Sequence, residues 1–254
     1  MLLRWACYAS FCLLILSACV PAGQTRTDKL QQADVHYKMA AAHMQANNPT
    51  MALKELLQAV QKDPENSSIH VTLAQAYQQK KAYSLAERHY LESLKLSESD
   101  PRYQNNLAAL YLDMGQWDKA ILYFDKAANN ILFSSAHVAL TGKAYAYYKK
   151  GDYTQALTFY QEAADLAPRY APAYYRKSEV YRQLNNTELE KLALQRAIDI
   201  APQFLQARYR FAELLIATDE LKQAEQQLQT IIEFSPTSEV GIQATGLLRS
   251  LPGS

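Results

Sequence analysis

Residues 137–170 have the sequence HVALTGKAYAYYKKGDYTQALTFYQEAADLAPRY, and residues 171–204 repeat its pattern as APAYYRKSEVYRQLNNTELEKLALQRAIDIAPQF. Each stretch contains a helical run, a polar turn, a second helical run and a proline near the end. The unit recurs along the chain, and alanine marks one position in five of six units: Ala52, Ala86, Ala120, Ala156 and Ala224. A fixed period of about 34 residues predicts a solenoid of stacked helix pairs.

The period divides most of the chain into six units, with two additional residues, Ser135 and Ala136, between the third and the fourth. The units are 33–66, 67–100, 101–134, 137–170, 171–204 and 205–238. Because each helix pair must bury its apolar face against its neighbours, the six units are expected to form one continuous domain.

Small residues predict where the helices cross. Positions are counted from the first residue of each unit. Position 8 is alanine or serine in every unit, position 20 is alanine in all units but the fifth, and position 27 is a small residue in most units. Position 24 carries a large apolar or aromatic residue: Leu56, Tyr90, Phe124, Tyr160, Leu194 and Leu228. Glu190 occupies position 20 of the fifth unit, so we expect this unit to pack loosely and Glu190→Ala to stabilise the protein.

Two further positions predict where the helices end. Position 15 closes the first helix, where residues that tolerate a left-handed backbone are favoured. Five units have Asn, Gly or Asp there, and the exception is Lys81. Position 32 is proline in four units, which ends the second helix, whereas Glu98 and Leu132 replace it in the second and third units.

This combination of small residues, a large residue at position 24 and a terminal proline resembles the tetratricopeptide repeat over residues 33–238. The resemblance implies an all-α fold, a right-handed superhelical solenoid of six helix-turn-helix repeats. Residues 239–254 contain Val240, Ile242, Leu247 and Leu248 and are expected to form a capping helix and tail. A solenoid end exposes apolar surface unless such an element covers it.

The N-terminus resembles a bacterial lipoprotein signal. Arg4 precedes an apolar stretch from Trp5 to Leu16, which is short for a membrane span. The sequence Leu16-Ser17-Ala18-Cys19 then matches the lipobox. The resemblance implies that residues 1–18 are cleaved, that Cys19 is lipidated, and that residues 19–32 form a tether. Val20 in place of Asp implies the outer membrane of a Gram-negative cell, facing the periplasm.

Composition argues against several functional classes. The chain has 26 Lys+Arg and 25 Asp+Glu, so it lacks the basic character expected of a nucleic-acid-binding protein. Cys7, Cys12 and Cys19 are the only cysteines, and the five histidines show no spacing typical of a metal site. No phosphate-binding glycine motif or nucleophile elbow occurs. We therefore expect no enzymatic activity, no cofactor, no metal and no small-molecule substrate.

Repeats of this kind bind proteins with the inner face formed by their first helices. Tyrosine and arginine are enriched at binding hot spots because they combine a large contact area with a polar end. Side-chain amides can bind a peptide backbone. The predicted partner-binding residues are Tyr145, Tyr148, Tyr175, Arg182, Tyr209, Asn105, Gln75 and Gln79. The alternative interpretation is that the tyrosines are packing residues.

Among lipoproteins built of these repeats, the chain is similar to the pilotin family of type IV pilus biogenesis and stability lipoproteins. The similarity rests on the lipobox, the six units and residues 105–160. This segment has an Asn-Asn opening, a slightly lengthened link in which Leu132 replaces proline, and a resumed repeat. The similarity implies that the chain binds secretin subunits and promotes their localisation and assembly. Two alternatives remain open: an adaptor for peptidoglycan hydrolases or an envelope protease, and a component of a polysaccharide-export or tight-adherence pilus system.

Overall fold

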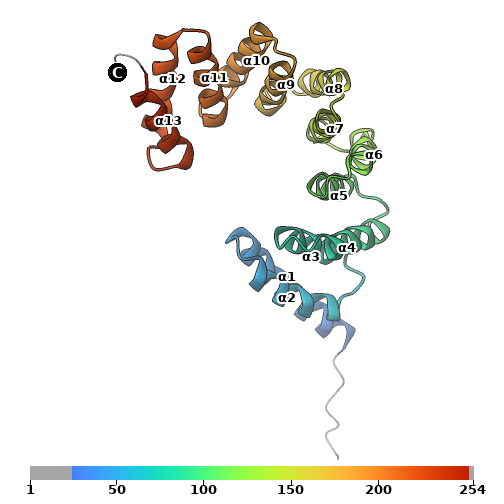
Figure 1. The fold of residues 1–254 in the computed structure, drawn as a ribbon. Helices are drawn as coiled ribbons and strands as arrows, with labels where there is room; N and C mark the ends of the chain where they lie inside the picture. Colours follow the sequence, from blue (N-terminus) through green and yellow to red (C-terminus); the bar gives the residue numbers. More distant parts are fainter. Residues whose placement is uncertain (1–24, 252–254) are drawn as a thin grey trace, which may run out of the picture.

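The computed structural model describes residues 25–251, a part of the chain that contains thirteen α-helices and no β-strand. The helices are α1 (Arg26–Gln45), α2 (Pro49–Lys62), α3 (Ser67–Gln79), α4 (Tyr83–Leu96), α5 (Pro101–Asp113), α6 (Trp117–Ala128), α7 (Ala136–Lys150), α8 (Tyr153–Leu166), α9 (Ala171–Gln183), α10 (Thr187–Ile200), α11 (Leu205–Ala217), α12 (Leu221–Phe234) and α13 (Glu239–Arg249). Each helix packs against the next, and the helix pairs stack into a curved array. The first helix of each pair lies on the inner side of this array (Figure 1). The predicted all-α solenoid is confirmed.

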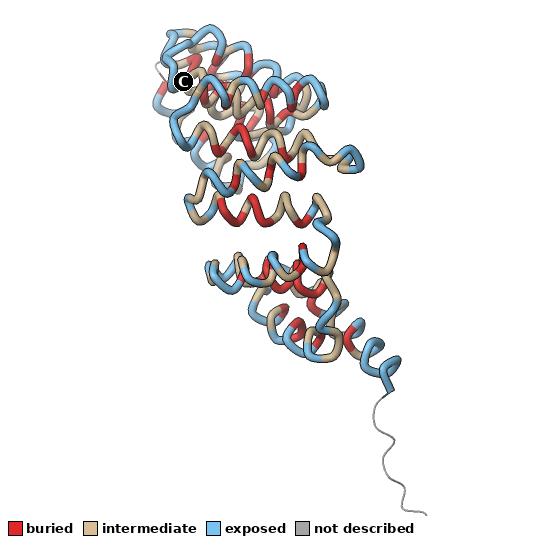
Figure 2. The backbone as a smooth tube through the Cα atoms, turned by 90° about the vertical axis from the view of Figure 1, so that its right-hand side faces the viewer, coloured by how far each residue is buried: buried red, intermediate tan, exposed pale blue. Residues whose placement is uncertain are grey.

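The helices approach closely because the small residues of the repeat lie where they cross. The residues at positions 8 and 27 are at most 1% exposed in all six units. The large side chains at position 24 are at most 3% exposed and fill the space between helices. Burying one such side chain contributes about 1.5–3 kcal/mol. Figure 2 shows buried segments recurring from helix to helix, with exposed residues concentrated at the turns.

The turn between the two helices of each unit has a left-handed residue at position 15, as predicted. The φ angles are +53° at Asn47, +58° at Lys81, +69° at Gly115, +81° at Gly151, +55° at Asn185 and +61° at Asp219. Lys81 adopts this conformation although its side chain does not favour it. The repeat geometry therefore determines the backbone at this position, whatever residue occupies it.

The expectation that Glu190 loosens the fifth unit is wrong. The residue is only 3% exposed, and its Oε1 accepts a hydrogen bond from Nε of Arg210 in the next unit (2.9 Å) and forms an ion pair with Nη2 of the same residue (2.8 Å). A buried carboxylate is tolerated when a cation and hydrogen bonds compensate for its desolvation. Glu190 therefore joins the fifth unit to the sixth.

A recurrent hydrogen bond joins three pairs of neighbouring units. In each pair, the side chain at position 4 of one unit meets the carbonyl oxygen of the proline at position 32 of the unit before. The pairs are His70 Nε2 with Pro64 O (2.9 Å), Tyr174 Oη with Pro168 O (3.4 Å) and Arg208 Nε with Pro202 O (2.6 Å). Where the preceding unit lacks the proline, position 4 is Gln104 or Leu140. At these three junctions the proline therefore supplies a hydrogen-bond acceptor between units as well as ending a helix.

The junction between the third and fourth units is built differently. The link between α6 and α7 contains Ile131 and Leu132, which are 97% and 86% exposed. Beyond it, α7 packs so closely on α6 that a Cβ at Gly142 would lie 2.3 Å from the ring of Phe124. The absence of a side chain at Gly142 therefore lets the two units stack despite the longer link.

The first helix begins earlier than the sequence indicated. Thr25 caps α1, since its side chain accepts from the backbone N–H of Asp28 while the Asp28 carboxylate accepts from Thr25 N–H, both at 3.1 Å. This capping box starts the helix at Arg26, so residues 26–32, which were expected to belong to the tether, are helical. The predicted signal peptide and Cys19 lie outside the described residues. No helix within residues 25–251 has the length and hydrophobicity of a membrane span.

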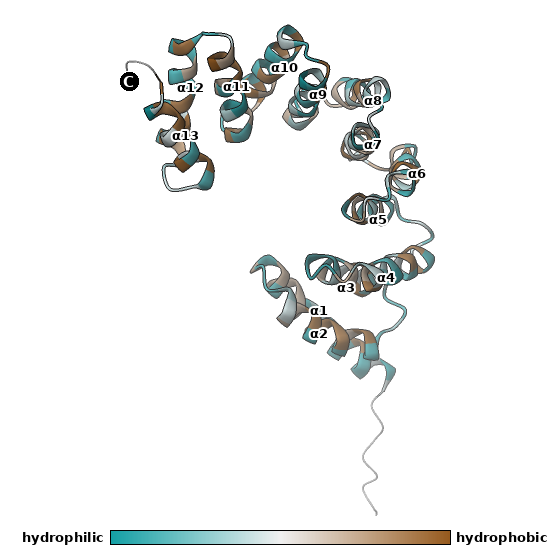
Figure 3. Ribbon diagram, viewed as in Figure 1, coloured by the Kyte–Doolittle hydropathy of each residue, from teal (hydrophilic) through white to brown (hydrophobic). Residues whose placement is uncertain are grey.

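The predicted capping helix is confirmed as α13. It begins at residue 239, one repeat length after the sixth unit begins at residue 205, and thus takes the place of the first helix of a seventh unit. Ala244 and Leu251 pack with Leu228 and Ile231 of α12, and Figure 3 shows hydrophobic segments where the two helices meet. Ile242, expected to help cover the end, is instead 63% exposed.

Candidate partner-binding groove

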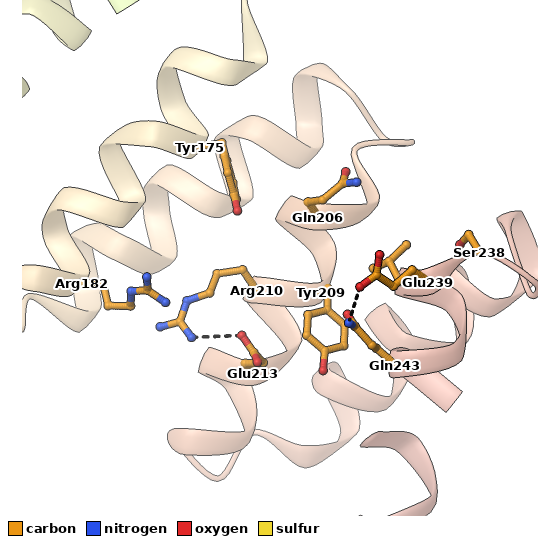
Figure 4. A pocket seen from close by; sticks show the side chains of 10 residues that line it. Tyr175, Arg182, Gln206, Tyr209, Arg210, Glu213, Ser238, Glu239 and Gln243 are labelled. Carbon is orange, nitrogen blue, oxygen red and sulfur yellow. Dashed lines mark hydrogen bonds and ion pairs between the residues drawn. The ribbon is translucent and has the colours of Figure 1, made fainter. Parts of the chain in front are cut away.

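A cavity of about 490 Å³ opens on the inner side of the array between α9, α11 and α13. Tyr175 and Arg182 of α9, Tyr209 of α11 and Glu239 of α13 line it, as Figure 4 shows. Its lining is completed by Gln206, Arg210, Glu213, Ser238, Val240 and Gln243. We call this cavity the C-terminal pocket. It contains three of the residues that the sequence predicts for partner binding.

The aromatic walls of the C-terminal pocket are held in place by packing. The ring of Tyr175 lies 5.0 Å from that of Phe204, centroid to centroid. Burial, with a contribution from nearby Glu179, raises the pKa of Tyr175, so its hydroxyl stays protonated at neutral pH. Tyr175 and Tyr209 therefore offer a ligand apolar ring surface together with neutral hydroxyl groups.

The charged groups of the C-terminal pocket differ in whether they are already paired. Arg210 is held from both sides, by Glu190 and by Glu213, whose Oε2 lies 3.1 Å from Arg210 Nη1. By contrast, the exposed side chain of Arg182 makes no hydrogen bond or ion pair within residues 25–251. Exposed Glu239 accepts only a 3.4 Å hydrogen bond from the Gln243 amide in the same part of the chain. Arg182 and Glu239 are thus the charges available to a ligand.

Next to this pocket, a tyrosine cluster formed by Tyr145, Tyr148, Tyr160 and Arg176 joins the fourth and fifth units. The rings of Tyr145 and Tyr148 stack with centroids 6.0 Å apart, and the Arg176 guanidinium lies 4.8 Å from the Tyr145 ring centre. Arg176 also donates to Glu179 at 2.8 Å. Beneath them, the hydroxyl of fully buried Tyr160 has no hydrogen-bond partner within the described residues. Packing thus accounts for part of the surface of these tyrosines.

A second cavity, of about 630 Å³, lies on the inner side of the first three units. We call it the amide cavity, because its polar lining is mostly amides, with one carboxylate from Asp113; the amides are those of Gln45, Gln75, Gln78, Gln79 and Asn106. Gln78 Oε1 accepts from the Tyr90 hydroxyl at 3.0 Å, and its Nε2 donates to Asp113 at 2.6 Å. These bonds fix Gln78, so that the amides beside it are the groups free to contact a peptide backbone.

The predicted binding residues therefore fall into three places along the inner face. Tyr175, Arg182 and Tyr209 line the C-terminal pocket, Tyr145 and Tyr148 form the tyrosine cluster, and Gln75 and Gln79 line the amide cavity. Asn105 joins none of them, because its Oδ1 is buried without a partner in the described chain and its neighbour Asn106 lines the cavity instead. Their part in binding stays a prediction.

The tyrosine cluster and the C-terminal pocket together form the groove, and sequence reasoning missed its arginine–glutamate pairs. Arg176 and Glu179 occupy positions 6 and 9 of the fifth unit, and Arg210 and Glu213 occupy the same positions of the sixth. Both pairs are bonded within one helix. The recurrence of Arg-x-x-Glu at the same positions of consecutive repeats was the available signal.

Histidines take part in packing and hydrogen bonding between helices. His36 Nδ1 lies 2.7 Å from Glu55 Oε2, and His70 Nδ1 lies 3.0 Å from His89 Nδ1. Within residues 25–251, no group of three or more His, Cys, Asp or Glu side chains is arranged to hold a metal ion.

Five models of the tetratricopeptide repeat match the chain, over residues 37–101, 105–131, 137–170, 171–204 and 192–244. Together they cover most of the array described above. The chain is a tetratricopeptide-repeat protein. Two of the models have the bounds of the fourth and fifth units, so the phase set by the recurring alanine is that of the tetratricopeptide repeat.

Curated relatives match parts of this tetratricopeptide-repeat protein at low identity. An uncharacterized protein of Haemophilus influenzae is 28% identical over 46% of the chain and 65% of its own length. The Hsp70-Hsp90 organizing protein of Triticum aestivum is 30% identical over 46% of the chain and 20% of its own length. The type IV pilus assembly protein PilF of Pseudomonas aeruginosa is 24% identical over 46% of the chain and 49% of its own length. The chain spans less than two thirds of each of these relatives.

Solved structures resemble this tetratricopeptide-repeat protein over more of its length. PilW, a type IV pilus biogenesis factor, has a TM-score of 0.71 and 16% identity, over 85% of this chain and 99% of PilW. PilF of Pseudomonas aeruginosa has a TM-score of 0.67 and 14% identity, over 86% of this chain and 99% of PilF. At these identities the likeness establishes a shared fold.

Proposed function

We propose that this tetratricopeptide-repeat protein is a non-catalytic scaffold that binds an extended segment of a partner protein along its inner face, in type IV pilus biogenesis. The observation that carries the proposal is the continuous row of aromatic and arginine side chains from the tyrosine cluster to the C-terminal pocket. Tyr and Arg side chains of this kind supply most of the binding energy in many protein interfaces.

The pilus assignment is supported by the resemblance in sequence to pilotins and by the fold shared with PilW and PilF. We propose secretin subunits as the partner, and localisation and assembly of the secretin as the outcome. A lipid on Cys19 would hold the protein at the outer membrane on the periplasmic side, with the solenoid available to the subunits. The lipid determines the location and the groove determines the partner.

The test is immunoprecipitation of the full-length lipidated protein from gently solubilised envelopes, followed by identification of the co-purifying proteins. We expect a secretin, and we expect Tyr148→Ala combined with Arg182→Ala to reduce its recovery while leaving the melting temperature within a few degrees. A matched control replaces one tyrosine and one arginine outside the groove, Tyr123 on α6 and Arg196 on α10, by alanine.

Recovery of murein hydrolases or an envelope protease without a secretin would contradict the pilus assignment and favour an enzyme adaptor. Recovery of polysaccharide-export or tight-adherence proteins would favour the remaining alternative. Equal loss of the partner in the control variant would contradict the placement of the binding site in the groove.

A separate variant tests the anchor. Cys19→Ser is expected to release the protein from the membrane fraction and to leave the secretin mislocalised or unassembled. Normal secretin multimers in cells that carry only this variant would contradict the proposed function of the lipid.

A further inference from the structure

We infer that the C-terminal pocket binds a peptide segment in which an apolar residue is flanked by an acidic residue on one side and a basic residue on the other. This inference rests on the proposed function, because it specifies the chemistry of the segment bound in the groove. It follows from which charges in the pocket are already paired and from where the unpaired ones lie.

Arg210 and its two glutamate partners form the floor of the pocket. Arg210 lies between Glu190 and Glu213, and it donates a hydrogen bond of 2.9 Å to Glu190 and one of 3.1 Å to Glu213. Glu190 is buried and Arg210 is bonded to two carboxylates, so Arg210 is held where it is and its positive charge is already balanced. Glu190 is thus a positioning residue of the pocket, and Arg210 is a poor receptor for a ligand carboxylate.

Arg182 and Glu239 form the rim of the pocket. Arg182 comes from the C-terminal end of α9 and Glu239 from the first residue of α13, so the two lie on opposite sides of α11. Figure 4 shows them on opposite sides of the pocket. Their separation leaves each side chain open to a ligand group of the opposite charge. Charge complementarity of this kind selects partners and fixes their orientation.

The space between Arg182 and Glu239 is lined by apolar and amide groups. Tyr175 and Tyr209 provide ring surface there, Val240 adds an apolar contact, and the amides of Gln206 and Gln243 can bond a peptide backbone. An apolar ligand residue fits between the rings, with its charged neighbours directed to the rim. The pocket is lined by two arginines and two glutamates, whose charges cancel. The buried carboxylate of Glu190 beneath them makes the net charge negative. The basic residue of the ligand therefore contributes more than the acidic one.

The capping helix is therefore part of the binding site as well as a cover for the solenoid end. Glu239, Val240 and Gln243 line the pocket, whereas Ala244 of the same helix packs on the last repeat. Val240 belongs to both sets, since it also packs against the apolar cluster around Ala244. Glu239 and Gln243 lie on a different face of α13 from Ala244, so these polar groups can be altered without removing the cap.

The experiment is selection of peptides from a random peptide display library on the full chain, followed by synthesis of the most enriched peptide and titration by fluorescence anisotropy. We expect the selected peptides to combine an acidic, an apolar and a basic residue. Arg182→Glu should weaken binding several-fold, and a peptide with its acidic residue changed to lysine should regain the loss. Glu239→Lys should show the mirror result with the basic residue changed to glutamate.

Rescue by charge exchange separates a direct contact from a loss of structure, since a misfolded variant would bind neither peptide. Arg196→Glu on α10 is the matched control and should leave both affinities unchanged. Selected peptides without the opposite charges, or charge exchange without rescue, would overturn the inference.

The two levels of proposal fail in different ways. If the peptides bind, lose affinity in Tyr148→Ala and ignore both charge reversals, binding in the groove stands and the specificity assigned to the pocket is wrong. If no enriched peptide depends on any groove residue and no partner is recovered from envelopes, the proposed function itself is wrong.

Discussion

Glu190 of the fifth repeat and Arg210 of the sixth form an ion pair with 2.8 Å between Oε1 and Nη2. The side chain of Glu190 is 4% exposed and that of Arg210 is 23% exposed. Glu190 occupies the position where the other five repeats have alanine, so this departure from the pattern forms a contact between repeats and supports the groove.

Glu190→Ala is therefore expected to destabilise the protein. Removing one partner of a fully buried pair costs about 3–5 kcal/mol. Because Arg210 keeps Glu213 and is partly exposed, we expect a smaller loss of about 1–2 kcal/mol in the free energy of unfolding, measured by urea denaturation. Glu190→Gln should be intermediate. A variant as stable as the wild type would show that the pair contributes nothing.

The two glycines of α13 predict opposite effects of alanine. A Cβ at Gly241 would lie 1.9 Å from the carbonyl oxygen of Ser235, whereas a Cβ at Gly246 would meet nothing within 4 Å. Gly241→Ala should displace the cap and cost about 1–3 kcal/mol. Gly246→Ala should stabilise the helix by about 0.5–1 kcal/mol. Thermal unfolding followed by circular dichroism would compare them, and equal effects would contradict the packing described for α13.

Two buried tyrosines at position 24 form another matched pair. The hydroxyl of Tyr90 donates to Gln78, whereas that of Tyr160 has no partner within residues 25–251. Tyr90→Phe should cost about 1 kcal/mol, and Tyr160→Phe should be neutral or stabilising because it removes an unsatisfied buried group. Urea unfolding of the two variants measures the difference, and a larger loss for Tyr160→Phe would show that its hydroxyl is bonded in solution.

Acidification is expected to weaken the packing of α3 against α4. Burial, the neighbouring His70 and Arg88 lower the pKa of His89 from 6.5 to about 4, while Glu92 acts in the opposite direction. A histidine with a lowered pKa stabilises the fold above pH 6.5, and this stability is lost as the pH falls towards 4. Because His89 is partly exposed, we expect a loss of about 1 kcal/mol rather than the full value of the shift.

The measurement for His89 is the free energy of unfolding at neutral pH and at two steps down towards the lowered pKa. His89→Gln, which cannot titrate, should reduce the dependence on pH without abolishing it, since other groups titrate in the same range. An unchanged slope in His89→Gln would assign the effect elsewhere.

The sequence sufficed for the repeat, its phase and its turns because these depend on residue size at fixed positions. A small residue is favoured where the two helices of a unit cross, and a left-handed residue occurs at position 15, where the two helices of a unit are joined. Even Lys81 follows the rule, since the geometry of the turn outweighs the preference of a single residue.

Contacts between units could not be predicted in the same way. The significance of Glu190 depends on Arg210, which belongs to the next unit and reaches back across a junction. The C-terminal pocket likewise needs α13 placed beside α11 before Glu239 can be seen to face Arg182. A periodic pattern gives the place of each backbone segment but not which polar side chains meet across a junction.

The position of α13 in the register of a seventh repeat has a consequence for engineering the array. A single consensus repeat inserted after Ser238 would find a helix on either side with the geometry it needs, and the chain would become longer with the same cap. That insertion would also carry Glu239 and Gln243 one repeat away from Arg182 and Tyr175. Length and ligand specificity are therefore linked at this end of the molecule, where a modular extension of the scaffold dismantles the pocket.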